Sequence, residues 1–167
     1  MSIALTFVDE NLLESAVVGP EGTAHYTTTT TSGLRGHKIT TITAAGGLVG
    51  SINWREKLFI INNVERKRDD LHSRKSGLLN PTYEWKWDDK AYEFKYSLKE
   101  LLVSPATGDT ADIVRFTIYH PHLFHDNERA ILCFPRPIQD EVERMFLLMA
   151  ILYTEITRQE IEAATGA

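Results

Sequence analysis

The sequence predicts a mainly β protein: a closed antiparallel barrel of about ten to twelve strands around a buried hydrophobic C-terminal helix. The first observation behind this prediction is a series of short β-branched or aromatic segments, separated by turn residues, over residues 3–134. The second is an uninterrupted apolar stretch, MFLLMAILY, at residues 145–153. A helix that is apolar all round is buried on every side. We therefore expect the strands to enclose this helix.

The strand predictions rest on alternating side chains and on β-branched residues. The clearest hairpin is formed by residues 83–87 and 92–96, where aromatic and charged residues alternate. Its aromatic side chains should share one face and form cross-strand pairs. Turns spaced by about 8–12 residues are typical of a sandwich or barrel. The expected strands are residues 3–8, 24–31, 38–43, 48–54, 58–61, 83–87, 92–96, 98–103, 113–119 and 130–134.

The helix is expected over residues 140–159 of a single domain that spans residues 1–167. Asp140 is the expected N-cap, and Glu143 lies three residues later, as in a capping box. Arg158 lies near the negative end of the helix dipole. Each fully buried apolar side chain of this helix contributes about 1.5–3 kcal/mol. We expect residues 160–167 to be frayed, as chain ends commonly are.

Composition and charge argue against some classes of binding partner and some cellular locations. The chain has 167 residues and a net charge of −5, which argues against a nucleic-acid partner. Its one cysteine, Cys133, cannot form an intrachain disulfide. The N-terminal segment lacks the basic start and apolar run of a secretory signal. Nine apolar residues are too few for a transmembrane helix, which takes about 20. We expect an intracellular, cytoplasmic location, with peripheral membrane contact as one option.

Three segments carry a resemblance to a known family. They are ITTITAAGGLVGSINW at 39–54, TYEWKW at 82–87 and FLLMAILYTEITR at 146–158. In this order they resemble an uncharacterised family of fungal domains of unknown function, known mainly from mushroom-forming basidiomycetes. More broadly, the chain is similar to the tubby C-terminal-like superfamily, which includes tubby domains, phospholipid scramblases and LURP-one-related proteins. In the fungal family, the helix ends with an aromatic residue, a Glu and then an Arg. Tyr153, Glu155 and Arg158 match this pattern.

The resemblance implies a barrel around a hydrophobic helix and supplies no catalytic residues. One departure concerns the turn before the aromatic strand. Family members usually have a glycine there, whereas this chain has Asn-Pro-Thr at residues 80–82. This difference bears on the geometry of the turn rather than on the fold.

Basic residues suggest a contact with anionic lipid. Five of them, together with three acids, lie between residues 64 and 75, and two more flank a glycine turn. A basic side chain near an anionic membrane contributes about 1 kcal/mol. Tubby domains bind phosphoinositides and scramblases associate with membranes, so the resemblance also favours lipid. The alternative is a solvated connecting loop or short helix. The candidates are Arg66, Lys67, Arg68, Arg74, Lys75, Arg35 and Lys38.

A histidine-rich segment is the candidate metal site. His120, His122 and His125 lie within six residues, beside an aspartate. Imidazole and carboxylate groups of this kind bind zinc or copper. The alternative is a solvated loop between two strands.

Catalytic motifs are missing from the sequence. It contains no Gly-x-Ser-x-Gly, His-Glu-x-x-His or Cys-x-x-Cys pattern. We therefore expect a non-enzymatic binding or scaffold domain without a cofactor, with peripheral binding of anionic lipid as the concrete hypothesis. One alternative is a protein–protein interaction or structural module with no small ligand. Another is a metal-dependent activity at the His120–His125 loop.

Overall fold

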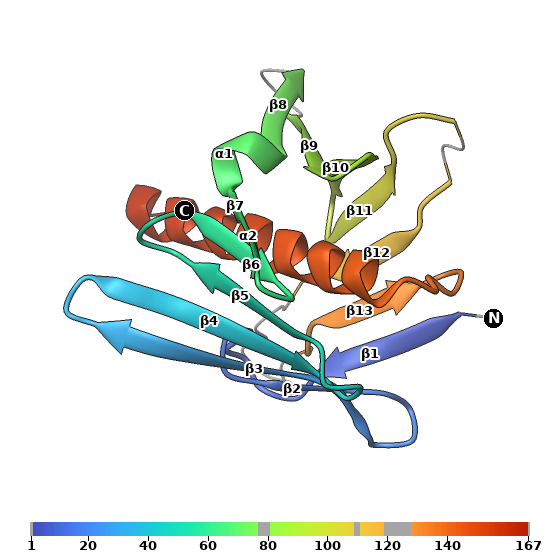
Figure 1. Cartoon of the computed structure of the whole chain (residues 1–167), viewed down its shortest axis with the longest axis horizontal. Coiled ribbons are helices and arrows are strands. Elements are labelled where there is room, and N and C mark those ends of the chain that lie inside the picture. Colours follow the sequence, from blue (N-terminus) through green and yellow to red (C-terminus); the bar gives the residue numbers. More distant parts are fainter. Residues whose placement is uncertain (1, 77–80, 109–110, 119–127, 167) are drawn as a thin grey trace.

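The computed structural model describes residues 2–76, 81–108, 111–118 and 128–166. Within these residues, thirteen strands form one antiparallel sheet, and a long C-terminal helix packs against it (Figure 1). The helices are α1 (Arg68–Leu71) and α2 (Glu141–Thr165). The strands are β1 (Ile3–Phe7), β2 (Ala16–Val18), β3 (Ala24–Gly33), β4 (Gly36–Ala44), β5 (Val49–Asn53), β6 (Leu58–Ile61), β7 (Val64–Lys67), β8 (His72–Ser76), β9 (Thr82–Trp87), β10 (Lys90–Ser97), β11 (Glu100–Pro105), β12 (Val114–Thr117) and β13 (Ile131–Phe134).

The mainly β prediction is confirmed, and each predicted strand segment overlaps an observed strand. Three strands were missed: β2, β7 and β8. β2 has only three residues, and β7 and β8 read VERK and HSRKS, without the alternating apolar residues that mark a strand. The predicted solvated loop or short helix at residues 64–75 is therefore a strand, one turn of helix and a second strand.

The closed barrel is corrected to an open sheet. The strand order runs β7-β6-β5-β4-β3-β2-β1-β13-β12-β11-β10-β9-β8, and no pairing joins β7 to β8 in the described residues. The chain passes between these two edge strands through the four-residue helix α1. A side-chain contact joins β7 to the end of β9 instead. The Arg66 guanidinium on β7 lies 4.3 Å from the Trp87 ring and pairs with Asp88 at 2.5 Å.

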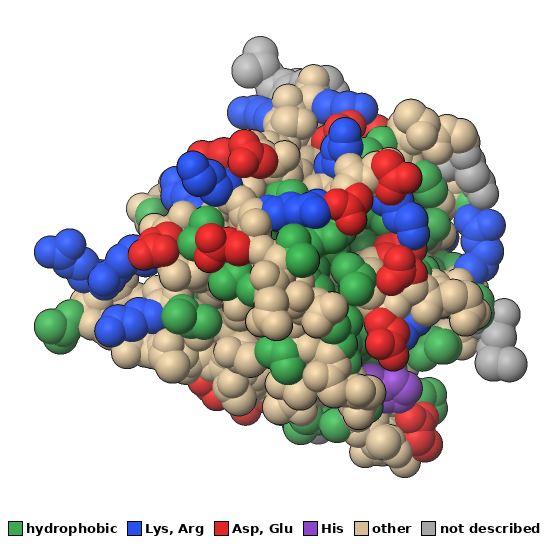
Figure 2. All heavy atoms as spheres, in the orientation of Figure 1, with side chains coloured by type: hydrophobic (Ala, Val, Ile, Leu, Met, Phe, Trp, Pro, Cys, Tyr) green, Lys and Arg blue, Asp and Glu red, His purple; other side chains and the backbone are tan. Residues whose placement is uncertain are grey.

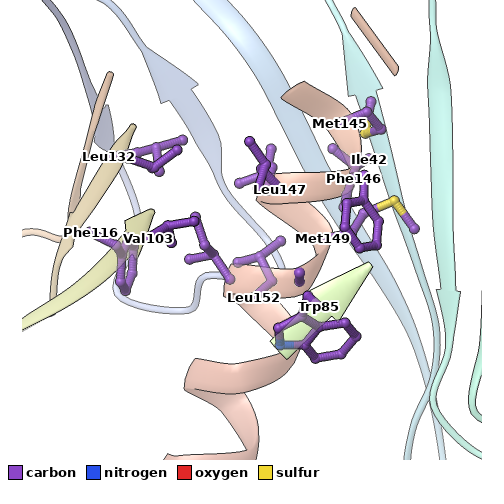
Figure 3. Packing of buried hydrophobic residues seen from close by; sticks show 14 of the residues in the cluster. Ile42, Trp85, Val103, Phe116, Leu132, Met145, Phe146, Leu147, Met149 and Leu152 are labelled. Atoms are coloured by element: carbon purple, nitrogen blue, oxygen red, sulfur yellow. The ribbon is translucent and has the colours of Figure 1, made fainter. Parts of the chain in front are cut away.

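The apolar stretch of α2 is buried on all sides, as predicted. All residues from Met145 to Leu152 have no exposed surface. Side chains from strands on both halves of the sheet surround them, among them Ile42, Trp85 and Phe116 (Figure 3). The aromatic hairpin β9–β10 also faces this core, and Tyr92 pairs with Trp85 across the strands. No helix in the described part of the chain is long and apolar enough to cross a membrane.

The helix starts as predicted and ends later than predicted. The Asp140 carboxylate accepts hydrogen bonds from the backbone N–H groups of Val142 and Glu143 at 2.9 and 3.4 Å. The Glu143 carboxylate binds the Tyr92 hydroxyl and the Lys90 ammonium instead of closing a capping box. The expected frayed tail is wrong over residues 160–165, which are helical. Gly166, in the left-handed conformation, caps the helix there.

A glycine allows β5 and α2 to pack closely. A Cβ atom on Gly50 would lie 2.7 Å from the Met149 sulfur and 2.9 Å from Met145. We expect Gly50→Val to lower the free energy of unfolding by about 1–3 kcal/mol, because overpacking forces side chains out of their rotamers. Urea denaturation measures this loss. Ser51→Val, one residue along the same strand, is the control. Equal stability of Gly50→Val and the wild type would contradict the packing described here.

Candidate functional site

The basic residues of the 66–75 segment do not form one free cationic surface. They are spread over β7, α1 and β8, with acidic partners beside several of them. Lys67 and Arg74 are exposed. The ion pairs are Arg66–Asp88 at 2.5 Å, Arg68–Asp69 at 2.9 Å and Lys75–Glu84 at 2.7 Å. These acids offset much of the positive charge that the sequence places in this segment.

The other two predicted cations, Arg35 and Lys38, lie in the β3–β4 hairpin. The hairpin projects beyond its neighbours in the sheet (Figure 1). The turn between β5 and β6 lies beside β4 a few residues from the hairpin tip, because the Trp54 backbone N–H donates to the Lys38 carbonyl at 2.9 Å. Arg55 and Lys57 extend from this turn and are exposed. These two residues are not among the lipid-binding candidates predicted from the sequence.

An exposed leucine stands at the tip of the same hairpin. Leu34 is fully exposed beside charged side chains. We call the group of Leu34, Arg35, Lys38, Arg55 and Lys57 the cationic end. Within the described residues, none of its four cations forms an ion pair. Figure 2 shows Lys and Arg side chains on the side where the hairpin projects, with acidic side chains set back from the tip.

A cleft opens beside the C-terminal half of α2. Its volume is about 370 Å³. The side chains that line it come from α1, β8, β9, β10 and α2. We call it the aromatic cleft, lined chiefly by Arg68, His72, Tyr83, Trp85, Tyr96 and Tyr153. None of the sequence predictions placed a pocket here.

The walls of the aromatic cleft are rings packed on one another. The His72 ring stacks on Tyr83 with centroids 5.3 Å apart. Tyr153 packs edge-on against Trp85 at 5.7 Å, and the Arg68 guanidinium lies 5.6 Å above the Tyr153 ring. Burial lowers the pKa of His72, and the positive charge of Arg68 lowers it further. The imidazole is therefore neutral at pH 7.

A buried ion pair supports one side of the cleft. The Glu155 side chain is almost fully buried and accepts hydrogen bonds from the Arg158 guanidinium at 2.5 and 2.9 Å. The Tyr96 hydroxyl donates to the same carboxylate at 2.9 Å. Burial and this carboxylate raise the pKa of Tyr96. Tyr153 stacks on Trp54 with centroids 5.1 Å apart. The residues that match the family's helix pattern thus have structural partners.

The candidate metal ligands His120, His122 and His125 lie outside the described residues. In the described ranges, no group of three or more His, Cys, Asp or Glu side chains is arranged to hold a metal ion. Cys133 is half-buried in β13.

Comparison with known proteins identifies a family. A search of curated proteins and a search of solved structures each gave no match. A family model described as "Family of unknown function (DUF6593)" matches residues 10–160, which is most of the chain. The chain belongs to this family of unknown function, DUF6593.

Proposed function

We propose that this chain is a non-enzymatic binding domain that contacts anionic lipid surfaces through the cationic end. The observation that carries the proposal is the projecting hairpin tip, where an exposed leucine stands among four cations that lack ion pairs in the described structure. An apolar side chain surrounded by basic ones suits the boundary between lipid headgroups and acyl chains. The partner would be a membrane rich in anionic lipid.

The expected binding free energy is of the size that gives reversible membrane contact. Four basic residues contribute on the order of 4 kcal/mol near an anionic surface. Burying the Leu34 side chain adds about 1.5–3 kcal/mol. One acid, Glu56, lies among the cations and reduces the first contribution. The attraction is screened over about 8 Å at physiological ionic strength, so binding should weaken as salt is added.

Co-sedimentation with vesicles tests the proposal. We expect the chain to bind vesicles that contain phosphatidylserine and not vesicles of phosphatidylcholine alone. Replacing Arg35, Lys38, Arg55 and Lys57 by Ser should lower the partition coefficient by at least a hundredfold, because every 1.4 kcal/mol is about tenfold.

The matched control changes net charge equally at the other half of the sheet. It replaces Lys86, Lys95, Lys99 and Arg115, which are exposed on β9 to β12 or the connecting turn, by Ser. The control variant should keep most of the binding. Equal losses in the two variants would show that only net charge matters. Absence of binding to any vesicle would overturn the proposal and favour a protein partner.

The relationship of this family to a wider superfamily is also a proposal. We infer that the family is related to the tubby-like superfamily and occurs in fungi, on the strength of the segment resemblance. The order of elements supports this inference, because the described strands all precede the long apolar helix. An intracellular location with peripheral membrane contact follows from the same proposal. Lys67 and Arg74, exposed near the edge strands, stay secondary lipid-contact candidates.

A further inference from the structure

We propose that the aromatic cleft binds one small amphipathic carboxylate. The ligand's ring or short apolar chain would lie against the tyrosine and tryptophan walls, with its carboxylate on Arg68. This site is separate from the cationic end and does not depend on membrane contact. The proposal rests on the shape and lining of the cleft, on the position of Arg68 and on the charge balance around it.

The size and lining of the cleft suit a small organic molecule. Its volume of about 370 Å³ lies near the lower end of the range for small-ligand sites. Tyr83 and Tyr153 are half-buried, so each presents part of a ring to the cleft, and Trp85 lies behind them fully buried. Aromatic faces and edges of this kind pack well against a flat ring or a methylene chain.

Arg68 supplies the polar anchor. Its side chain is about one-fifth exposed, and its Nε atom is buried without a hydrogen-bond partner in the described structure. One terminal nitrogen, Nη2, pairs with Asp69, whose side chain is three-quarters exposed. A buried donor without an acceptor is costly. A ligand carboxylate could accept from the Arg68 guanidinium where it lines the cleft. Reaching Nε as well, in the bidentate arrangement that guanidinium groups favour, requires the side chain to turn toward the ligand.

The charges around the cleft limit a bound anion to a single negative charge. The second guanidinium, Arg158, is engaged by Glu155 and by Glu162, each at 2.5 Å. His72 is neutral at pH 7, as argued above. Arg68 also has an acidic partner, but the Asp69 carboxylate is three-quarters exposed and contacts the terminal nitrogen Nη2, so Arg68 can still receive a ligand carboxylate. Glu162 at the rim would repel a second negative charge. A carboxylate fits this balance better than a phosphate dianion does.

Isothermal titration calorimetry with a matched pair of probes tests the proposal. The probes are 2-naphthoate and its neutral analogue 2-naphthylmethanol. We expect the wild type to bind one naphthoate, at least tenfold more tightly than the alcohol. Arg68→Gln should abolish that difference, whereas Lys67→Gln, which removes a neighbouring charge outside the cleft, should leave it unchanged. Thr157→Tyr, which fills the cleft from α2, should weaken both probes at least tenfold.

The opposite results would overturn the proposal. These are equal affinity of acid and alcohol for the wild type, naphthoate binding unaffected by Thr157→Tyr, or no saturable binding at millimolar probe. Circular dichroism checks that each variant is folded. If Arg68→Gln fails to fold, the probe ratio in the wild type and the Thr157→Tyr result still decide. The variant with four serines at the cationic end should bind naphthoate normally, so failure of the lipid proposal leaves this result intact.

Discussion

Leu148→Asp is expected to leave the chain unfolded. Leu148 lies in the middle of α2, where its side chain has no exposed surface and is surrounded by the apolar core. A carboxylate there would lose its hydration without gaining a cationic partner, which costs several kcal/mol even if the group takes up a proton. The substitution also removes the packing of a buried leucine, worth about 2–5 kcal/mol in comparable cases. Domains of this size are stable by only about 5–15 kcal/mol.

Circular dichroism and size-exclusion chromatography measure this effect. Loss of the helical signal, expansion or aggregation is the expected outcome. Ala163→Asp, an exposed position on the same helix, is the control and should stay folded. A soluble and cooperatively folded Leu148→Asp protein would mean that α2 is not the centre of the core.

Arg158→Leu should lower the free energy of unfolding by roughly 3 kcal/mol. The substitution leaves the Glu155 carboxylate, whose side chain is only 1% exposed, without its charged partner. The loss is placed at the lower end of the usual range because the Arg158 side chain is one-quarter exposed, and water there can partly take its place. The Tyr96 hydroxyl and the Gln159 amide would still donate to Glu155.

Urea denaturation of the wild type, Arg158→Leu and a double variant measures this contribution. The double variant Glu155→Leu/Arg158→Leu removes both charges together, so it should be more stable than Arg158→Leu alone. Arg158→Lys keeps the charge without the planar guanidinium and should lie between the wild type and Arg158→Leu. A double variant less stable than Arg158→Leu would contradict the view that an unpaired buried carboxylate causes the loss.

Elements with a strong local pattern were predictable from the sequence. The strict alternation of residues 83–87 predicted that their aromatic side chains share one face, and Trp85 and Trp87 on that face of β9 are buried. The nine apolar residues of α2 predicted a buried helix. The charged residues of β7 and β8 gave no sequence pattern that predicts a strand. These segments are strands because they pair with β6 and β9. Whether the sheet closes depends on whether the edge strands β7 and β8 pair, and no local sequence pattern encodes that pairing.

The candidate sites were harder to predict than the fold. Arg35 and Lys38 were recognised as basic residues near a turn, but Arg55 and Lys57 join them only because β4 pairs with β5. The aromatic cleft combines Arg68, Trp85 and Tyr153, which come from three separate segments of the chain. The sequence indicated that Trp85 and Tyr153 belong to the core. Nothing in it placed a guanidinium over the Tyr153 ring.

The most direct test of the proposed membrane contact is a fluorescent label at the hairpin tip. The environment-sensitive dye NBD would be attached at Leu34→Cys in a Cys133→Ser background, with Val64→Cys as a control. Val64 is also exposed, and it begins β7 at the opposite end of the antiparallel strands from this tip. Phosphatidylserine vesicles should shift the emission of the dye at position 34 to shorter wavelength, with little change at position 64. No shift at position 34, or equal shifts at both positions, would contradict contact through the cationic end.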